Sequence, residues 1–227
     1  MKPRFANRAE AARLLAERLL RLQLPKPIVV LALPRGGVPM GAVVARALGA
    51  ALDLVLVRKI GAPWQPELAL AAVAEGEPPE IVVDPNRGQR GAVEAGWIEA
   101  QARAELAEIA RRREVYLHGR PRAELAGCTA IVVDDGIATG TTMMAALRAL
   151  RRRHPARLVL AVPVAPQDTL EALRAEVDQV VCLSQPFPFH AVGLHYAEFD
   201  QVDDAGVMEA LNWAHRGPPP RGQDTDE

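Results

Sequence analysis

The chain has few cysteines, few aromatic residues and no excess of charge of either sign. Its 227 residues include 2 cysteines, and aromatic residues make up 4% of the total. The 27 basic and 28 acidic residues give a formal net charge of −1. Binding to the phosphate backbone of nucleic acids usually needs a positive excess, so we expect no nucleic-acid partner.

Long apolar runs are also absent. No run approaches the ~20 apolar residues that cross a bilayer, and Arg4, Arg8 and Glu10 interrupt the region where a signal peptide would need an apolar core. Cys128 and Cys182 each lie beside a short apolar run, where a thiol is more often a small buried hydrophobe than a ligand or nucleophile. We therefore expect a cytoplasmic protein with no membrane contact.

Short apolar runs typical of buried strands recur along the chain, with amphipathic segments between them. The expected strands are residues 28–33, 52–57, 81–83, 130–133, 158–162 and 177–183. The expected helices are residues 41–48, 98–113, 141–152 and 168–176. Strands that alternate with helices predict an α/β fold with a doubly wound, mostly parallel sheet.

The two ends of the chain differ in character. Asn7 and Glu10 resemble a capping box, and Leu15 and Leu19 then fall on one helical face, which predicts an amphipathic N-terminal helix with a packing role. Residues 216–227 combine three consecutive prolines with polar residues and are predicted to be disordered. We expect one domain over residues 1–215, with a core at about 28–183 and a small hood at about 184–200.

Residues 131–142 are the most informative segment, with the sequence Ile-Val-Val-Asp-Asp-Gly-Ile-Ala-Thr-Gly-Thr-Thr. Asp134 and Asp135 end a buried strand, where two carboxylates can accept hydrogen bonds from a vicinal diol and stabilise positive charge at a sugar carbon. The following loop enters a helix whose N–H groups and threonine hydroxyls suit a phosphate, and Gly136 and Gly140 allow close approach. The segment predicts a phosphorylated-sugar site.

Other interpretations of this segment are possible. Two aspartates at a strand end are often turn residues, and Thr141 or Thr142 would then simply cap the helix. A P-loop needs a lysine before its final hydroxyl residue, and a dinucleotide fingerprint needs Gly-x-Gly-x-x-Gly; neither occurs in this loop. An ATPase or a dehydrogenase is therefore disfavoured.

The segment resembles the 5-phosphoribosyl 1-pyrophosphate (PRPP) signature of type I phosphoribosyltransferases. The resemblance implies that Asp134 and Asp135 contact the ribose and act in catalysis. It assigns the donor's 5-phosphate to a group of loop residues: Gly136, Ile137, Ala138, Thr139, Gly140, Thr141 and Thr142.

Two upstream segments fit the same family. The first strand runs into a glycine-rich turn containing Arg35, Gly36 and Gly37, at the sheet edge where open α/β folds bind ligands. The resemblance implies that this turn, with Arg58 and Lys59 at the next strand end, binds pyrophosphate. The alternatives are a tight strand-to-helix turn and a solvated basic pair. Residues 62–79, rich in proline, are a candidate lid.

In this family the acceptor base is recognised by a variable segment, the hood, which the resemblance places here at residues 184–196. Phe187 and Phe189 could stack on a planar base, and His190 could hydrogen-bond to it. Aromatic residues after a final strand are, however, more often part of a small hydrophobic cluster beside the main core. The 6-oxopurine enzymes usually carry a carboxylate where this chain has Ala138. Its absence argues against hypoxanthine or guanine as acceptor.

The resemblance implies a transferase of nucleotide metabolism that moves the phosphoribosyl group of PRPP to a nitrogenous base. Mg²⁺ is the expected cofactor, held mainly by substrate oxygens, so we assign no firm protein ligand to a metal. A homodimer is expected from the family. Two alternatives remain: a non-catalytic regulator that senses PRPP, and a hydrolase related to this family.

Overall fold

The computed structural model describes residues 4–84 and 95–216. The predicted disordered tail lies outside these residues, apart from Arg216. No helix within the described ranges is long and apolar enough to cross a membrane.

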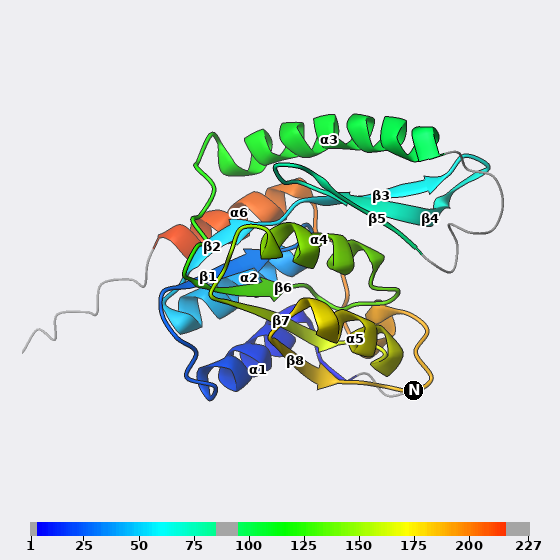
Figure 1. Cartoon of the computed structure of the whole chain (residues 1–227). Coiled ribbons are helices and arrows are strands. Elements are labelled where there is room, and N and C mark those ends of the chain that lie inside the picture. Colours follow the sequence, from blue (N-terminus) through cyan, green and yellow to red (C-terminus); the bar gives the residue numbers. More distant parts are fainter. Residues whose placement is uncertain (1–3, 85–94, 217–227) are drawn as a thin grey trace, which may run out of the picture.

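A five-stranded parallel sheet forms the centre of the molecule (Figure 1). Its strands run in the order β2-β1-β6-β7-β8, all parallel, so their carboxyl ends meet at one edge. This arrangement confirms the predicted fold class. The strands are β1 (Ile28–Ala32), β2 (Ala51–Leu54), β6 (Thr129–Val133), β7 (Arg157–Val164) and β8 (Gln179–Ser184).

Helices cover both faces of this sheet because alternate strand residues are apolar on both sides. One face carries α1 (Arg8–Leu20), α2 (Gly37–Leu48) and α6 (Asp204–His215), and contributes Val30 and Ile131 to the core. The other face carries α4 (Thr141–Arg151) and α5 (Gln167–Leu173), followed by η1 (Arg174–Glu176), and contributes Leu31 and Val132. The buried core therefore consists of two layers separated by the sheet.

A second, antiparallel sheet of three strands lies beside the parallel one. It is formed by β3 (Val57–Ala62), β4 (Gln65–Ala74) and β5 (Glu80–Val83). The predicted strand 52–57 is in fact divided between β2 and β3. Residues 81–83 form a strand as predicted, but in this second sheet, and the candidate lid 62–79 is mostly strand β4.

The antiparallel sheet lies between two helices, α4 and the long α3 (Ala95–Leu117) (Figure 1). Ala71 and Val73 belong to the core that includes α3, while Ala72 and Ala74 pack with Ala145 of α4. Both faces of β4 are therefore buried. Successive side chains of a strand point to opposite faces, and here both faces pack against apolar residues, which explains why this run of small apolar residues forms a strand.

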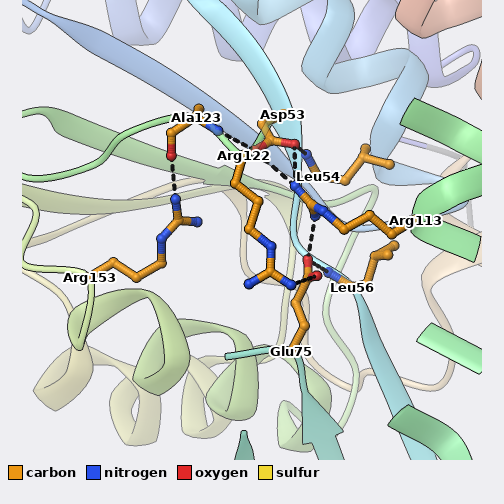
Figure 2. A network of polar contacts seen from close by, with 8 residues as sticks. All are labelled: Asp53, Leu54, Leu56, Glu75, Arg113, Arg122, Ala123 and Arg153. Carbon is orange, nitrogen blue, oxygen red and sulfur yellow. Dashed lines mark hydrogen bonds and ion pairs between the residues drawn. The ribbon is translucent and has the colours of Figure 1, made fainter. Parts of the chain in front are cut away.

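The C-terminal part of α3 is joined to the core by buried charges (Figure 2). The Arg113 guanidinium donates to both Asp53 carboxylate oxygens at 3.1 and 3.3 Å and to the Glu75 carboxylate at 2.8 Å. Arg122 donates to the second Glu75 oxygen at 2.9 Å, and backbone N–H groups of Leu54, Leu56 and Ala123 complete the set. The network ties α3 to β2 and to the end of β4.

The N-terminal segment is hydrogen-bonded to the hood. The backbone N–H groups of Arg4 and Phe5 donate to the His195 carbonyl, and Ala197 donates back to Phe5 at 2.9 Å. The Phe5 and Tyr196 rings contact each other with centroids 5.4 Å apart. Asn7 caps α1 as predicted, but this end of the chain also has a structural role beyond packing.

Candidate functional site

A cavity of about 630 Å³ opens at the carboxyl edge of the parallel sheet. One side is formed by the loop between β6 and α4, and another by the end of β1 and the start of β3. Val192, in the short helix η2 (Val192–His195), adds a hood residue. The lining residues are Leu33, Pro34, Val55, Val57, Arg58, Lys59, Ala69, Arg112, Asp134, Gly136, Ile137, Ala138, Thr139, Gly140, Thr142, Met143 and Val192.

Asp134 lines this cavity at the end of β6. One of its carboxylate oxygens accepts a hydrogen bond from the Asp135 backbone N–H at 2.8 Å. Burial raises the pKa of Asp134 well above its usual value, and the charge of Asp135 raises it further. No cation within the described residues lies within ion-pair distance of Asp134, so its charge is left for a ligand to balance.

Asp135 has different surroundings and does not line the cavity. Its carboxylate oxygen Oδ2 accepts from Arg8 of α1, at 2.9 Å from Nε and 2.8 Å from the terminal nitrogen. Burial raises the Asp135 pKa, and the Arg8 guanidinium opposes that shift. The two adjacent acids therefore face different neighbours.

The loop after the acids is held in place from behind. The Ile137 N–H donates to the Val164 carbonyl at 3.0 Å, and the Thr169 hydroxyl donates to the Ala138 carbonyl at 2.9 Å. Gly140 caps α4 with φ +80°, a left-handed conformation that favours glycine. The loop thus reaches the α4 N-terminus, where helix N–H groups and the helix dipole favour an anion. Of the predicted phosphate residues, Thr141 does not line the cavity.

The turn after β1 packs tightly against the acidic pair. A Cβ atom on Gly36 would lie 1.9 Å from Asp135 Oδ2, and one on Gly37 would lie 2.8 Å from the Val133 carbonyl oxygen. Only glycine fits at these two positions. Pro34 lines the cavity, whereas Arg35, Gly36 and Gly37 do not. The Arg35 guanidinium points instead towards Asp204, at 3.8 Å.

Three cations, Arg58, Lys59 and Arg112, line the same cavity as the phosphate loop. Arg58 is paired with Glu105 of α3 at 2.6 Å, and Arg112 of α3 is paired with Glu108 at 2.7 Å. Lys59 has no carboxylate partner among the described residues. The basic pair predicted to receive pyrophosphate therefore lies in the cavity, and α3 adds a third cation.

The predicted base-binding residues lie outside the cavity lining. Phe187 is 97% exposed, Phe189 stacks on His195 with centroids 5.1 Å apart, and His190 is exposed. The hood residue that does line the cavity is Val192, which is also close to Gly136: a Cβ there would lie 2.5 Å from the Val192 side chain. The apolar lining residues Ile137 and Val192 are therefore candidates for contact with a planar ligand, in place of the expected aromatic ones.

Sequence reasoning missed three contributors to this site. Arg8 is 127 positions from Asp135, and no local pattern relates the two. Arg112 stands in a run with Arg111 and Arg113, and a run of arginines does not show which member faces the cavity. Val192 was overlooked in favour of nearby aromatics, although an apolar side chain can flank a planar ligand equally well.

The family model of the phosphoribosyl transferase domain matches residues 5–198. The chain belongs to the phosphoribosyl transferase family. This match includes the acidic pair, the phosphate loop, the basic pair and Val192. It also includes α1, and therefore Arg8.

Two kinds of relative support this family assignment. The crystal structure of the protein TT1426 from Thermus thermophilus is 44% identical, covers 92% of this chain and 99% of that one, and superimposes with a TM-score of 0.76. A Mycobacterium tuberculosis H37Rv protein named "Putative phosphoribosyl transferase Rv0571c" is 44% identical over 212 residues. The match covers 93% of this chain and 47% of that protein, so the chain spans about half the length of this curated relative.

Proposed function

We propose that this chain transfers the 5-phosphoribosyl group of PRPP to a nitrogenous base and releases pyrophosphate. The observation that supports this function is the cavity in which Asp134 and the Gly136–Thr142 loop face Lys59 and Arg58. A donor with a phosphate at one end and a pyrophosphate at the other needs this distribution of charge. The loop would bind the 5-phosphate, the acidic end of β6 the ribose, and the cations the pyrophosphate.

Catalysis in such a site is electrostatic and positional. Departure of pyrophosphate builds positive charge on the ribose ring and negative charge on the leaving oxygen. The Asp134 carboxylate stabilises the first, while Lys59 and Arg58 stabilise the second. Arg35 follows Pro34, which lines the cavity. The long Arg35 side chain would contact the same leaving group if it separated from Asp204. In the turn that follows, the Gly37 N–H already donates to the Leu33 carbonyl at 3.1 Å, so the Gly36 N–H would be the backbone donor for this group.

Mg²⁺ fits this site as a substrate-bound ion. Within residues 4–84 and 95–216, no three His, Cys, Asp or Glu side chains gather closely enough to hold a metal. Mg²⁺ commonly keeps several waters and uses substrate phosphates with one or two carboxylates. Asp134 is the carboxylate that would hold it here, and the ion would supply further charge neutralisation for the leaving pyrophosphate.

The acceptor would contact the apolar lining residues Ile137 and Val192. Ala138 stands where a carboxylate could assist a 6-oxopurine, and no acid other than Asp134 lines the cavity among the described residues. This observation also favours the second candidate, a regulator that binds PRPP without turning it over. In solution, the transferase is expected to be a cytoplasmic homodimer.

The test is Mg²⁺-dependent pyrophosphate release from PRPP, screened against purine, pyrimidine and other nitrogenous acceptors, with donor binding measured by calorimetry. Acceptor-dependent release identifies a transferase and its base, while binding without release identifies the sensor. Release with no acceptor indicates a hydrolase. Asp134→Asn should weaken donor binding, whereas Glu17→Gln, which removes one exposed carboxylate on α1, should leave it unchanged. Wild-type protein that binds no PRPP would refute the proposal.

A further inference from the structure

Arg8 is the one residue of α1 that the structure connects to the acidic pair. Its guanidinium contacts Asp135 Oδ2 with two nitrogens, at 2.9 and 2.8 Å. A third nitrogen donates to the Asp200 carbonyl at 2.6 Å, and the guanidinium carbon lies 3.8 Å from the centre of the Phe199 ring. Arg8 therefore spans the space between the acidic pair and the segment after η2.

Asp135 is in turn enclosed by three parts of the chain. Arg8 holds its carboxylate, Gly36 leaves no room for a side chain beside it, and the Tyr196 hydroxyl donates to its backbone carbonyl at 2.6 Å. The side chains of Arg8 and Asp135 are both 15% exposed. An ion pair at this depth, with two guanidinium nitrogens on one oxygen, has a defined geometry and is costly to break.

The Asp134 carboxylate, in contrast, is not held by an arginine among the residues that the structure describes. It lines the cavity and accepts one hydrogen bond, from the neighbouring Asp135 backbone N–H, so it can accept further hydrogen bonds from a ligand in the cavity. A carboxylate that binds the two hydroxyl groups of a ribose must have oxygens free to accept hydrogen bonds from them. Asp134 meets this condition, whereas Oδ2 of Asp135 is already occupied by Arg8.

We infer that Arg8 is a positioning residue for the donor site: it fixes Asp135 as an organising carboxylate that holds the β1–α2 turn and the hood together, leaving Asp134 to bind the ribose. This inference rests on the proposed function. It assigns different roles to two adjacent acids and makes the N-terminal helix part of the PRPP site.

The test is a double-substitution cycle on PRPP affinity, measured by calorimetry with Arg8→Gln, Asp135→Asn and the pair combined. If Asp135 acts through Arg8, each single change should weaken affinity about tenfold, and the pair should also lose about tenfold because the second change removes nothing further. Asp134→Asn should instead weaken affinity by a similar factor with or without Arg8. Arg13→Gln, on the exposed side of the same helix, removes the same charge and should leave affinity unchanged.

Losses that multiply to about a hundredfold would overturn the inference, because Asp135 would then contact the donor independently of Arg8. An unchanged affinity in Arg8→Gln would also overturn it. If Arg8→Gln does not fold, Arg8→Lys takes its place, since it keeps the charge but not the two-nitrogen contact; it should bind PRPP more weakly than wild type, and equal affinity would overturn the inference. Wild-type protein without PRPP binding would refute the proposed function itself, and the inference with it. Binding that depends on Asp134 but multiplies across Arg8 and Asp135 would refute the inference alone.

Discussion

Two groups of buried charges in this protein are arranged in opposite ways. In the network of Asp53, Glu75, Arg113 and Arg122, each carboxylate oxygen accepts from at least one guanidinium or backbone N–H group (Figure 2). Asp134 is partly buried and has no ion-pair partner among the described residues. A fully paired group holds helices and strands together, whereas an unpaired one destabilises the fold and is available to a ligand.

The largest effect is expected at the centre of the paired network. Arg113→Met would leave Asp53 without its cation and Glu75 with only Arg122, and should lower the free energy of unfolding by about 3–5 kcal/mol. Urea denaturation measures the change. Arg103→Met, an exposed position on the same helix, should have little effect. Equal stability of the two variants would show that the network does not hold α3 in place.

Asp134→Asn should change stability in the other direction. Removing a partly buried, unpaired carboxylate should raise the free energy of unfolding by on the order of 1 kcal/mol while the affinity for PRPP falls. Because burial raises the folded-state pKa of Asp134, wild-type stability falls as pH rises from the unfolded-state pKa towards the folded-state one. The gain should therefore be absent at low pH and grow through that range. A variant less stable than wild type at neutral pH would contradict this account.

Thr169→Val tests how firmly the phosphate loop is held by its neighbours. It removes the hydroxyl that donates to the Ala138 carbonyl, and should cost about 0.5–1.5 kcal/mol of stability or less, because water can reach this carbonyl. The loop would be held less firmly, so the Michaelis constant for PRPP should rise several-fold with little change in kcat. A fall in kcat alone would show that the hydroxyl does not act through donor binding.

The smallest effect is expected at an exposed ion pair. Arg148 and Glu176 lie 2.9 Å apart, but the Arg148 side chain is 44% exposed. Arg148→Ala should therefore change the free energy of unfolding by about 0.2–1 kcal/mol, and the change should shrink further in high salt. A loss comparable to that of Arg113→Met would mean that burial does not separate the two kinds of pair.

Local patterns in the sequence were sufficient for the parallel core. Apolar runs located the strands of the large sheet, and the glycine and threonine pattern after Asp135 located the loop at the α4 N-terminus. Residues 62–79 were assigned to a lid because they are rich in proline, and the strand character of the alanine-rich run within them was missed. Proline is tolerated at the start of a strand, which is where Pro66 stands in β4.

The site could be predicted only where its residues are close in sequence. Asp134 and the loop up to Thr142 form one continuous segment, so a pattern could reveal them. The pairing of Arg8 with Asp135 depends on how α1 packs beside the sheet, and the choice of Arg112 among three arginines depends on the orientation of α3. The roles of Arg35, Lys59 and the two acids stay predictions until donor binding is measured.

The contact between Gly36 and Asp135 also has a consequence for how this chain can vary in evolution. A Cβ at position 36 would overlap the carboxylate at position 135, so the Asp135 side chain would have to move or be replaced. A lineage that acquires alanine at position 36 would thereby disturb the contact between Asp135 and Arg8. Positions 8, 36 and 135 should therefore change together among relatives, although they lie far apart in the sequence.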